Sequence, residues 1–269
     1  VTLYALDVIC EASMNTTVNA QKDADSEYVR SVKEMCRIIL YRSLSPIKMW
    51  DTFYNLSRDS QKEKKALHIL HGFTNSVIKN RSQELEKDPV KQPTAEEDEV
   101  GSKKRVTFLD LLLQCRVDGK PLPHNMIREE VDTFTFEGHD TTSSGIQFAL
   151  FLLAHHPDIQ EKIVVEIRQI MGNVNQQFAF ADIQKMKYLE MVIKECLRMY
   201  PSVPIIARKL TTEMRTASNY VIPANTVTHV HIYGVHHNPL LYPNPEKFDP
   251  ERFSPENCRG RHPFAYIPF

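Results

Sequence analysis

Apolar residues recur every three or four positions through most of the chain, which is the spacing of amphipathic helices. This repeat predicts helices at residues 26–40, 56–85, 125–155, 157–171 and 182–200. Pro157 is expected to end the third helix, and Asp182 is the expected N-cap of the last one. At 1.5 Å per residue, the helix at 125–155 would be about 46 Å long, enough to cross a whole domain.

The pattern changes after Pro201. Residues 221–222 and 227–233 have the character of short strands, and the prolines at 239, 243, 245, 250 and 255 indicate a turn-rich meander over 238–269. Residues 84–105 are densely charged and carry two prolines without any periodicity, so we expect a surface loop inside one domain rather than a domain boundary. The predicted fold class is mostly α with a minor β-sheet.

The composition of the chain argues against several classes of cofactor and binding partner. The 269 residues are 42% hydrophobic and 25% charged, as in ordinary globular proteins. None of the eight glycines forms the Gly-rich loop that holds a dinucleotide or a phosphate. Lys and Arg (33) balance Asp and Glu (34), which argues against nucleic-acid binding. The five cysteines include no C-x-x-C pair, so neither a zinc knuckle nor a disulfide framework is indicated.

Small and polar residues interrupt the apolar helix predicted at 125–155. Gly138, Thr142, Gly145 and Ala149 would share one face. Close packing of two helices explains such a stripe, and so does a flat ligand lying against the backbone. The residues Glu137, His139 and Asp140 favour the ligand, because the apolar flanks predict burial, and burial of ionisable groups is costly.

Two further patterns carry little information by themselves. Glu195 and Arg198 have the i, i+3 spacing of an ordinary exposed ion pair. His229 and His231 alternate on a predicted strand near His236, but no neighbouring Cys or carboxylate completes a metal site. Hydrogen-bonded or solvent-facing histidines are the better interpretation, and a His-dependent metal-binding hydrolase is a weak alternative. No nucleophile-elbow motif occurs.

Taken together, these motifs resemble a known family. Residues 130–142, EVDTFTFEGHDTT, are similar to the central helix of the cytochrome P450 haem-thiolate monooxygenases, in particular to the thirteen-residue pattern of family 4. Glu195-x-x-Arg198 matches the E-x-x-R motif of that superfamily, residues 250–253 match its P-E-R-F stretch, and the run that ends at Phe269 matches the approach to its haem loop. The resemblance spans the chain and implies an incomplete cytochrome P450 fold.

The resemblance implies an enzyme that inserts one oxygen atom from O2 into a fatty acid or a similar lipophilic substrate. It implies roles for Thr141 in holding dioxygen and a water, and for Asp140 in supplying protons. The cofactor would be heme b (iron protoporphyrin IX), with Gly138 and Thr142 against it and Glu137 in a position to form an ester with it.

Other roles follow from the same resemblance. Arg208 would meet a haem propionate, and Glu195, Arg198 and Arg252 would form a structural ion-pair triad beneath the haem. The substrate pocket would be lined by Val203, Pro204, Ile205 and Ile206. Electrons would come from NADPH-cytochrome P450 reductase, with cytochrome b5 as a second partner, at the cytoplasmic face of the endoplasmic reticulum membrane.

We expect the chain to be a fragment. It opens at Val1 in sequence typical of the interior of a domain, and the axial cysteine of the family's haem loop would lie beyond Phe269. None of the five cysteines sits in such a loop, so no metal ligand is assigned, and the segment alone is not expected to form a thiolate-ligated haem. The alternative is a truncated helical remnant without catalytic activity.

Overall fold

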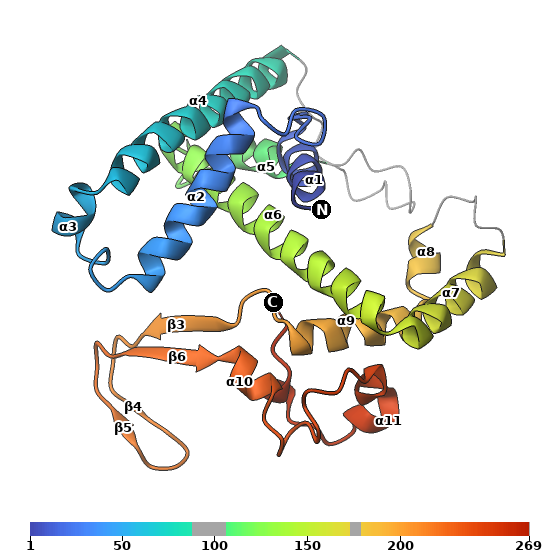
Figure 1. The fold of residues 1–269 in the computed structure, drawn as a ribbon. Helices are drawn as coiled ribbons and strands as arrows, with labels where there is room; N and C mark the ends of the chain where they lie inside the picture. Colours follow the sequence, from blue (N-terminus) through green and yellow to red (C-terminus); the bar gives the residue numbers. More distant parts are fainter. Residues whose placement is uncertain (88–105, 173–178, 269) are drawn as a thin grey trace. The chain divides into compact units, whose positions relative to one another are not determined.

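The computed structural model describes residues 1–87, 106–172 and 179–268, and these residues are mostly helical (Figure 1). The α-helices are α1 (Thr2–Met14), α2 (Glu27–Leu44), α3 (Asp51–Asn55), α4 (Arg58–Lys87), α5 (Phe108–Gln114), α6 (His124–His155), α7 (Pro157–Met171), α8 (Phe180–Ile183), α9 (Lys187–Met199), α10 (Ile232–His236) and α11 (Pro255–Cys258). Short 3-10 helices, η1 and η2, cover Pro250–Phe253 and Pro263–Ala265.

In the part of the chain that the structure describes, the strands form three antiparallel two-stranded ribbons. β1 (Arg116–Val117) pairs with β2 (Lys120–Pro121), β3 (Ile205–Lys209) with β6 (Val227–His231), and β4 (Met214–Arg215) with β5 (Val221–Ile222). The predicted class, mostly α with a minor sheet, is confirmed. The strand expected at 227–233 is shorter than predicted, because helix α10 begins at Ile232.

The long amphipathic segments fold as their spacing predicts, and the errors lie at their ends. The helices expected at 26–40, 56–85 and 125–155 are α2, α4 and α6 with shifted bounds, and the helix at 157–171 is α7. The expectation for 182–200 is wrong at its start. Asp182 lies in the short helix α8, where its carboxylate accepts from the Ala179 N–H, and α9 begins only at Lys187.

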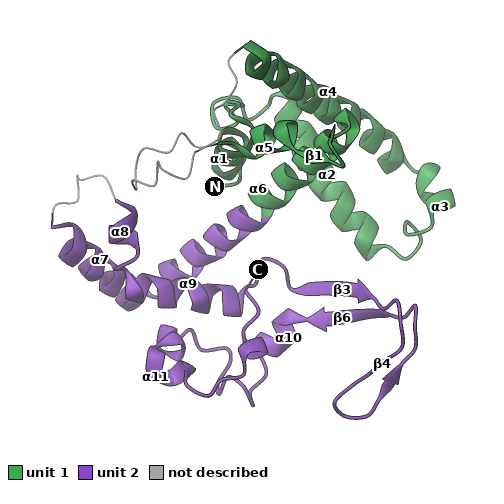
Figure 2. Ribbon diagram, turned by 180° about the vertical axis from the view of Figure 1, so that it is seen from behind, with its two compact units in different colours: residues 1–140 green, residues 141–269 purple. Residues whose placement is uncertain are grey.

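The chain divides into two compact units, residues 1–140 and 141–269, coloured separately in Figure 2. The division falls inside α6 and not in the charged segment at 84–105. Of that segment, residues 84–87 are the last turn of α4, so the loop prediction is wrong for them. Residues 88–105 lie outside the described residues.

The core of unit 1 forms where α1, α2, α4, α5 and the first half of α6 bring their apolar faces together. Its most deeply buried members are Cys10, Ala20, Val29, Ile78, Leu109 and Val131. Helices α2 and α4 make the most extensive contact and lie side by side in both views (Figures 1 and 2). A cavity lies between α2, α4 and the first half of α6.

The core of unit 2 packs α7 and α9 against the last turns of α6 and the meander. It is made of Leu152, Ile159, Ile163, Val192, Cys196, Met199 and Phe248. Stacking of Phe148 on Tyr200, with ring centroids 4.7 Å apart, continues this contact between α6 and the end of α9. Across the described residues, no helix is both long and apolar enough to span a membrane.

Candidate functional site

Helix α6 continues without a break through the segment rich in Gly, Ser and Thr. Of the three ionisable residues expected to be buried there, only His139 is, at 1% exposure. Glu137 and Asp140 are exposed, so the expectation of burial is wrong for both. Thr141 is half-buried and Thr142 is exposed. The segment therefore carries the carboxylates of Glu137 and Asp140 and the hydroxyls of Thr141 and Thr142 at or near the surface.

Side chains of the protein pack against both glycines of the small-residue stripe of α6. A Cβ at Gly138 would lie 2.8 Å from the Cδ1 atom of Ile9 in α1. A Cβ at Gly145 would lie 3.3 Å from Ser202 Oγ and 3.7 Å from Leu197 Cδ2. Helix packing thus explains both glycines, since Ile9 fills the side of the helix that the missing Cβ of Gly138 would face. The cofactor contact expected at Gly138 stays a prediction.

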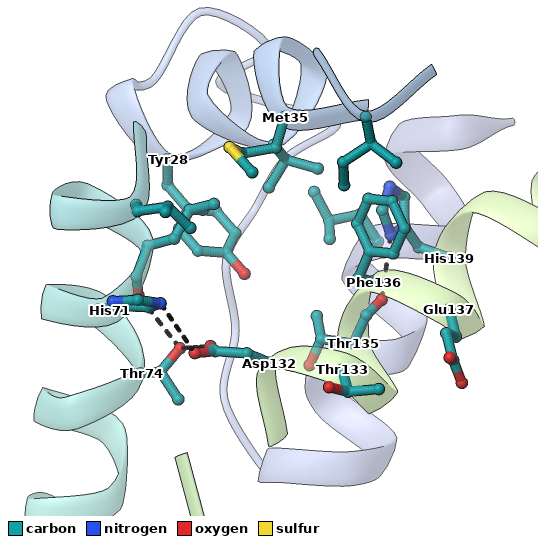
Figure 3. A pocket seen from close by; sticks show the side chains of 15 residues that line it. Tyr28, Met35, His71, Thr74, Asp132, Thr133, Thr135, Phe136, Glu137 and His139 are labelled. Carbon is teal, nitrogen blue, oxygen red and sulfur yellow. Dashed lines mark hydrogen bonds and ion pairs between the residues drawn. The ribbon is translucent and has the colours of Figure 1, made fainter. Parts of the chain in front are cut away.

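A cavity of about 260 Å³ lies in unit 1 between α2, α4 and α6 (Figure 3). Its wall is mainly apolar. The apolar lining comes from Leu6, Val32, Met35, Ile39, Leu67, Leu70 and Phe136. Sequence reasoning missed this cavity, because periodicity shows which face of each helix is apolar but not where two such faces fail to meet.

One end of this cavity is polar. Figure 3 shows Tyr28, His71, Thr74 and Asp132 grouped there, apart from Glu137. Thr74 Oγ1 donates to Asp132 Oδ1 at 2.5 Å, and His71 Nε2 lies 3.7 Å from Asp132 Oδ2. Burial raises the pKa of Asp132, and burial likewise raises the pKa of Tyr28. The cavity therefore offers hydrogen-bonding groups at one end and hydrocarbon along the rest.

Glu195, Arg198 and Arg252 meet inside unit 2. Arg198 Nε donates to Glu195 Oε2 at 2.7 Å, and its Nη2 donates to Oε1 at 2.9 Å. The Nε atom of Arg252 lies 3.5 Å from the same Oε1 atom. Glu195 and Arg198 are both 0% exposed. The spacing-based expectation of an exposed pair is wrong, because the meander covers the polar face of α9.

The meander supplies the remaining hydrogen bonds of this cluster. Arg198 donates to the carbonyl oxygens of His236 (2.9 Å) and Pro245 (2.7 Å), and Glu195 Oε1 accepts from the Asp249 N–H at 2.9 Å. The attraction within a buried ion pair offsets the desolvation of its charges only when the remaining donors and acceptors are also hydrogen-bonded. Glu195 and Arg198 meet this condition, whereas the buried Nε atom of Arg252 has no hydrogen-bond partner in the described structure. The cluster ties α9 to residues some fifty positions later in the chain.

The three histidines considered for a metal do not form a site. His229 and His231 lie on β6, opposite Ala207 and Ile205. His236 is buried elsewhere: its Nδ1 is 3.2 Å from the Arg198 carbonyl, and its Nε2 accepts from the Ile267 N–H at 2.9 Å. Burial lowers the pKa of His236 to about 4. Both nitrogens of the neutral ring are therefore used by the backbone, and the metal interpretation of these histidines is wrong.

The residues expected to line the substrate pocket and to meet the propionate lie at the start of unit 2. Val203 and Pro204 precede β3, and Ile205, Ile206 and Arg208 belong to it. Arg208 is exposed, and its Nη1 donates to the Ala207 carbonyl at 2.7 Å. Ile205 is 47% exposed, which is a large apolar exposure for a strand residue. Their roles stay predictions.

The comparisons with known proteins agree over the whole chain. The pattern of the family described as "Cytochrome P450" matches residues 1–269. The human protein "Cytochrome P450 4V2" is 43% identical over 270 residues, covering 100% of this chain and 51% of its own length. "Cytochrome P450 4c3" of Drosophila melanogaster is 42% identical over 279 residues, with the same two shares. The chain thus spans about half the length of these relatives.

Solved structures show the same fold. The haem domain of "cytochrome P450DA" superposes with a TM-score of 0.80 at 20% identity, and it is covered to 54% by this chain. A structure titled "Retinoic acid bound cyanobacterial CYP120A1" gives a TM-score of 0.76 at 25% identity, with 56% covered. Both matches include 100% of this chain. The helices, the buried Glu195–Arg198 cluster and the match of residues 1–269 to the family lead to one conclusion: this chain belongs to the cytochrome P450 family.

Proposed function

We propose that the protein is a haem-thiolate monooxygenase that inserts one oxygen atom from O2 into a lipophilic substrate, using electrons from NADPH. The observation that carries the proposal is the family match over residues 1–269, together with identities above 40% to relatives of family 4. Because the chain spans about half of those relatives, the proposal concerns the whole protein of which these residues form part.

The exposed polar residues of the chain fit the contacts that a haem needs at its edge. Arg208 would bind a propionate, and Thr142 would lie against the ring. We do not assign the axial thiolate to any of the five cysteines, since Cys10 and Cys196 are buried in the two cores and the others lie outside a haem loop. When bound, a thiolate-ligated haem supplies the redox chemistry that activates dioxygen.

Asp140 and Thr141 are consecutive residues of α6, an exposed acid beside a half-buried alcohol. We infer that the Asp140 carboxylate exchanges protons with solvent and that the Thr141 hydroxyl passes them inward. Exposure supports this role, since a proton relay needs one group in contact with water. Such general acid–base catalysis contributes typically about 10² to 10⁴ in rate.

The substrate is proposed to be a fatty acid or a similar lipophilic molecule. The largely apolar cavity of unit 1 supports this class, and its polar end, at Asp132 and His71, would bind a hydroxyl group. Val203, Pro204, Ile205 and Ile206 of unit 2 are proposed separately as substrate contacts of the whole protein, consistent with the exposed apolar side chain of Ile205. Concave, mostly apolar sites with a few polar groups are typical of small-molecule binding.

The remaining roles concern the whole protein. We propose heme b as the cofactor, NADPH-cytochrome P450 reductase and cytochrome b5 as redox partners, and the cytoplasmic face of the endoplasmic reticulum as the location. The triad of Glu195, Arg198 and Arg252 is proposed to hold the polypeptide beneath the haem, because it joins α9 to the meander.

Thr141→Ala in the full-length protein tests the proposed function. We expect the haem content to be unchanged and the product formed per NADPH consumed to fall by about tenfold or more, with peroxide or water formed instead. Ser144→Ala, one turn along the same helix, is the matched control. Substrate oxidation with unchanged coupling in Thr141→Ala would remove the proton-relay role, and absence of any substrate oxidation in the wild type would remove the monooxygenase assignment.

Glu137 is proposed to form an ester with the haem, and its exposed carboxylate on α6 supports this. The test is acid–solvent extraction of haem from the denatured full-length protein, followed by mass spectrometry of the peptide that contains Glu137. We expect part of the haem to stay attached in the wild type and all of it to leave in Glu137→Gln. Complete extraction from the wild type would exclude the ester.

A further inference from the structure

The polar end of the unit 1 cavity has hydrogen-bonding capacity that the protein itself does not use. Asp132 Oδ1 accepts from Thr74 Oγ1 at 2.5 Å. The other oxygen, Oδ2, has two nitrogen neighbours, His71 Nε2 at 3.7 Å and Arg128 Nε at 3.9 Å, and both distances are longer than a hydrogen bond. Among the described residues, Oδ2 therefore has polar neighbours but accepts no hydrogen bond.

The ring of His71 faces this oxygen from the neighbouring helix. His71 lines the cavity from α4 and Asp132 from α6, and Figure 3 draws the two side chains toward each other. Because a carboxylate can only accept, it favours the tautomer of His71 with the proton on Nε2. The cavity thus holds a donor and an acceptor 3.7 Å apart, a spacing that one bridging oxygen completes.

The chemistry of this pair selects the head group of a ligand. A hydroxyl oxygen within about 2.8 Å of both atoms donates to Asp132 Oδ2 and accepts from His71 Nε2 at once. A carboxylate is repelled by Asp132, and an ether only accepts, so it leaves Oδ2 unpaired. An ammonium group only donates, so it leaves His71 unpaired, and it would lie near the Arg128 guanidinium. Of these groups, the hydroxyl is the one that satisfies both residues.

The size and the wall of the cavity determine the rest of the ligand. An apolar cavity of about 150 Å³ holds one benzene molecule, so the cavity of about 260 Å³ holds roughly ten non-hydrogen atoms by proportion. Away from the polar end its wall is hydrocarbon, with Val32, Met35, Leu70 and Phe136 among the lining residues. An unbranched alcohol of about nine carbons has this number of atoms and this distribution of polarity.

We propose that the cavity of unit 1 binds a neutral primary alcohol of medium chain length, whose hydroxyl bridges Asp132 Oδ2 and His71 Nε2. This inference rests on the proposed function, because it names the head group of the lipophilic substrate assigned to that cavity. Asp132 and His71 are the residues that distinguish an alcohol from a fatty acid or an ether of the same length. Thr74 is a positioning residue, since its hydrogen bond holds Oδ1 and leaves Oδ2 beside His71.

Equilibrium dialysis with the full-length, haem-loaded protein tests the head group without any turnover. The probes are 1-nonanol, its isomer methyl octyl ether, and nonanoate. We expect the wild type to bind 1-nonanol at least about tenfold more tightly than either of the others, because only the alcohol donates to the Asp132 carboxylate. Equal affinity for 1-nonanol and the ether would overturn the proposal. Absence of saturable 1-nonanol binding would also overturn it, and the polar end would then hold water alone.

Two substitutions locate the bound alcohol. Asp132→Asn keeps an acceptor toward Thr74 but puts an N–H donor in place of Oδ2, so it should weaken 1-nonanol binding by about tenfold and leave ether binding undiminished. His71→Phe keeps a ring without the nitrogen, so it should weaken the binding of both probes. Glu130→Gln and His68→Phe change exposed residues of the same two helices and should bind as the wild type does. A preference for 1-nonanol that persists in Asp132→Asn would overturn the proposal.

Oxidation is measured separately, so that the two proposals can fail independently. If the full-length protein shows the expected preference for 1-nonanol but oxidises no lipophilic molecule, the monooxygenase assignment fails and the alcohol site stands. If it oxidises lipophilic molecules but binds 1-nonanol and the ether equally, the monooxygenase assignment stands and the alcohol site is excluded.

Discussion

The Glu195 cluster and the middle of α6 show two different ways in which this chain places charge. Glu195 and Arg198 are fully buried, and each is bonded to the other and to the backbone of the meander. On α6, Glu137 and Asp140 are exposed beside a buried His139. Buried, mutually neutralised charge fixes structure, whereas charge left at the surface can exchange protons or bind ligands. The comparison therefore separates a structural set of residues from a chemical one.

The largest effect is expected from Glu195→Gln. The substitution keeps the shape but leaves the Arg198 guanidinium buried without its counter-charge, which costs about 3–5 kcal/mol in the free energy of unfolding. The loss of stability is measured at α9 by hydrogen exchange of its amides, followed by mass spectrometry at increasing urea concentration.

The matched control for this change lies on the same helix. Glu190 forms exposed ion pairs with Lys187 and Lys194 at 3.4 and 2.7 Å, so Glu190→Gln should cost no more than about 0.5 kcal/mol. Equal losses for the two variants would mean that burial does not decide the energetic value of these charges, and the comparison would fail.

The second largest effect is a pH dependence of the stability of unit 2, which is due to His236. Its pKa of about 4 lies below the ordinary value of 6.5, so the unfolded chain binds the proton more tightly between these values. Stability contributed by the neutral ring is therefore present above about pH 6.5 and is lost as the pH falls toward 4. Between pH 7 and pH 5 this amounts to about 2 kcal/mol.

His236→Asn provides the reference for that measurement, because its amide can still donate to the Arg198 carbonyl but does not titrate. The loss of α9 protection from pH 7 to pH 5 should be about 2 kcal/mol smaller in the variant than in the wild type. The exposed His229 on β6 gives the control substitution, His229→Asn, which should leave the wild-type pH dependence unchanged. Identical pH profiles for wild type and His236→Asn would contradict the buried neutral ring.

Local patterns predicted the long helices well, because an apolar repeat over fifteen or more residues reports which face is buried. The same reasoning placed Glu195 and Arg198 at the surface, because nothing within α9 shows that the meander from Pro245 to Asp249 will cover their face. The resemblance to the family predicted that Glu195 and Arg198 would meet Arg252, which their spacing alone did not indicate. The Ile9 contact of Gly138 and the approach of Cys36 to His139 are also long-range, and no local signal indicates them.

The smallest predicted effect concerns the glycines of the helices. Gly138→Ala gains about 1 kcal/mol of helix propensity, but its methyl group would meet Ile9 Cδ1 at 2.8 Å, so a net loss of up to about 1 kcal/mol is expected. Gly72, in the middle of α4, has no atom within 4 Å of the added Cβ, and Gly72→Ala should stabilise the protein by about 0.5–1 kcal/mol.

A double-mutant cycle with Ile9→Ala identifies the cause. Removing the Cγ1 and Cδ1 atoms of Ile9 leaves its Cβ 3.9 Å from the new methyl group, an ordinary contact. Gly138→Ala should then become stabilising, and the coupling between the two positions should be about 1 kcal/mol or more, measured by hydrogen exchange of the α1 and α6 amides. Zero coupling would mean that Ile9 does not fill the face of Gly138, and a cofactor contact at that glycine would again be the better explanation of the small residue.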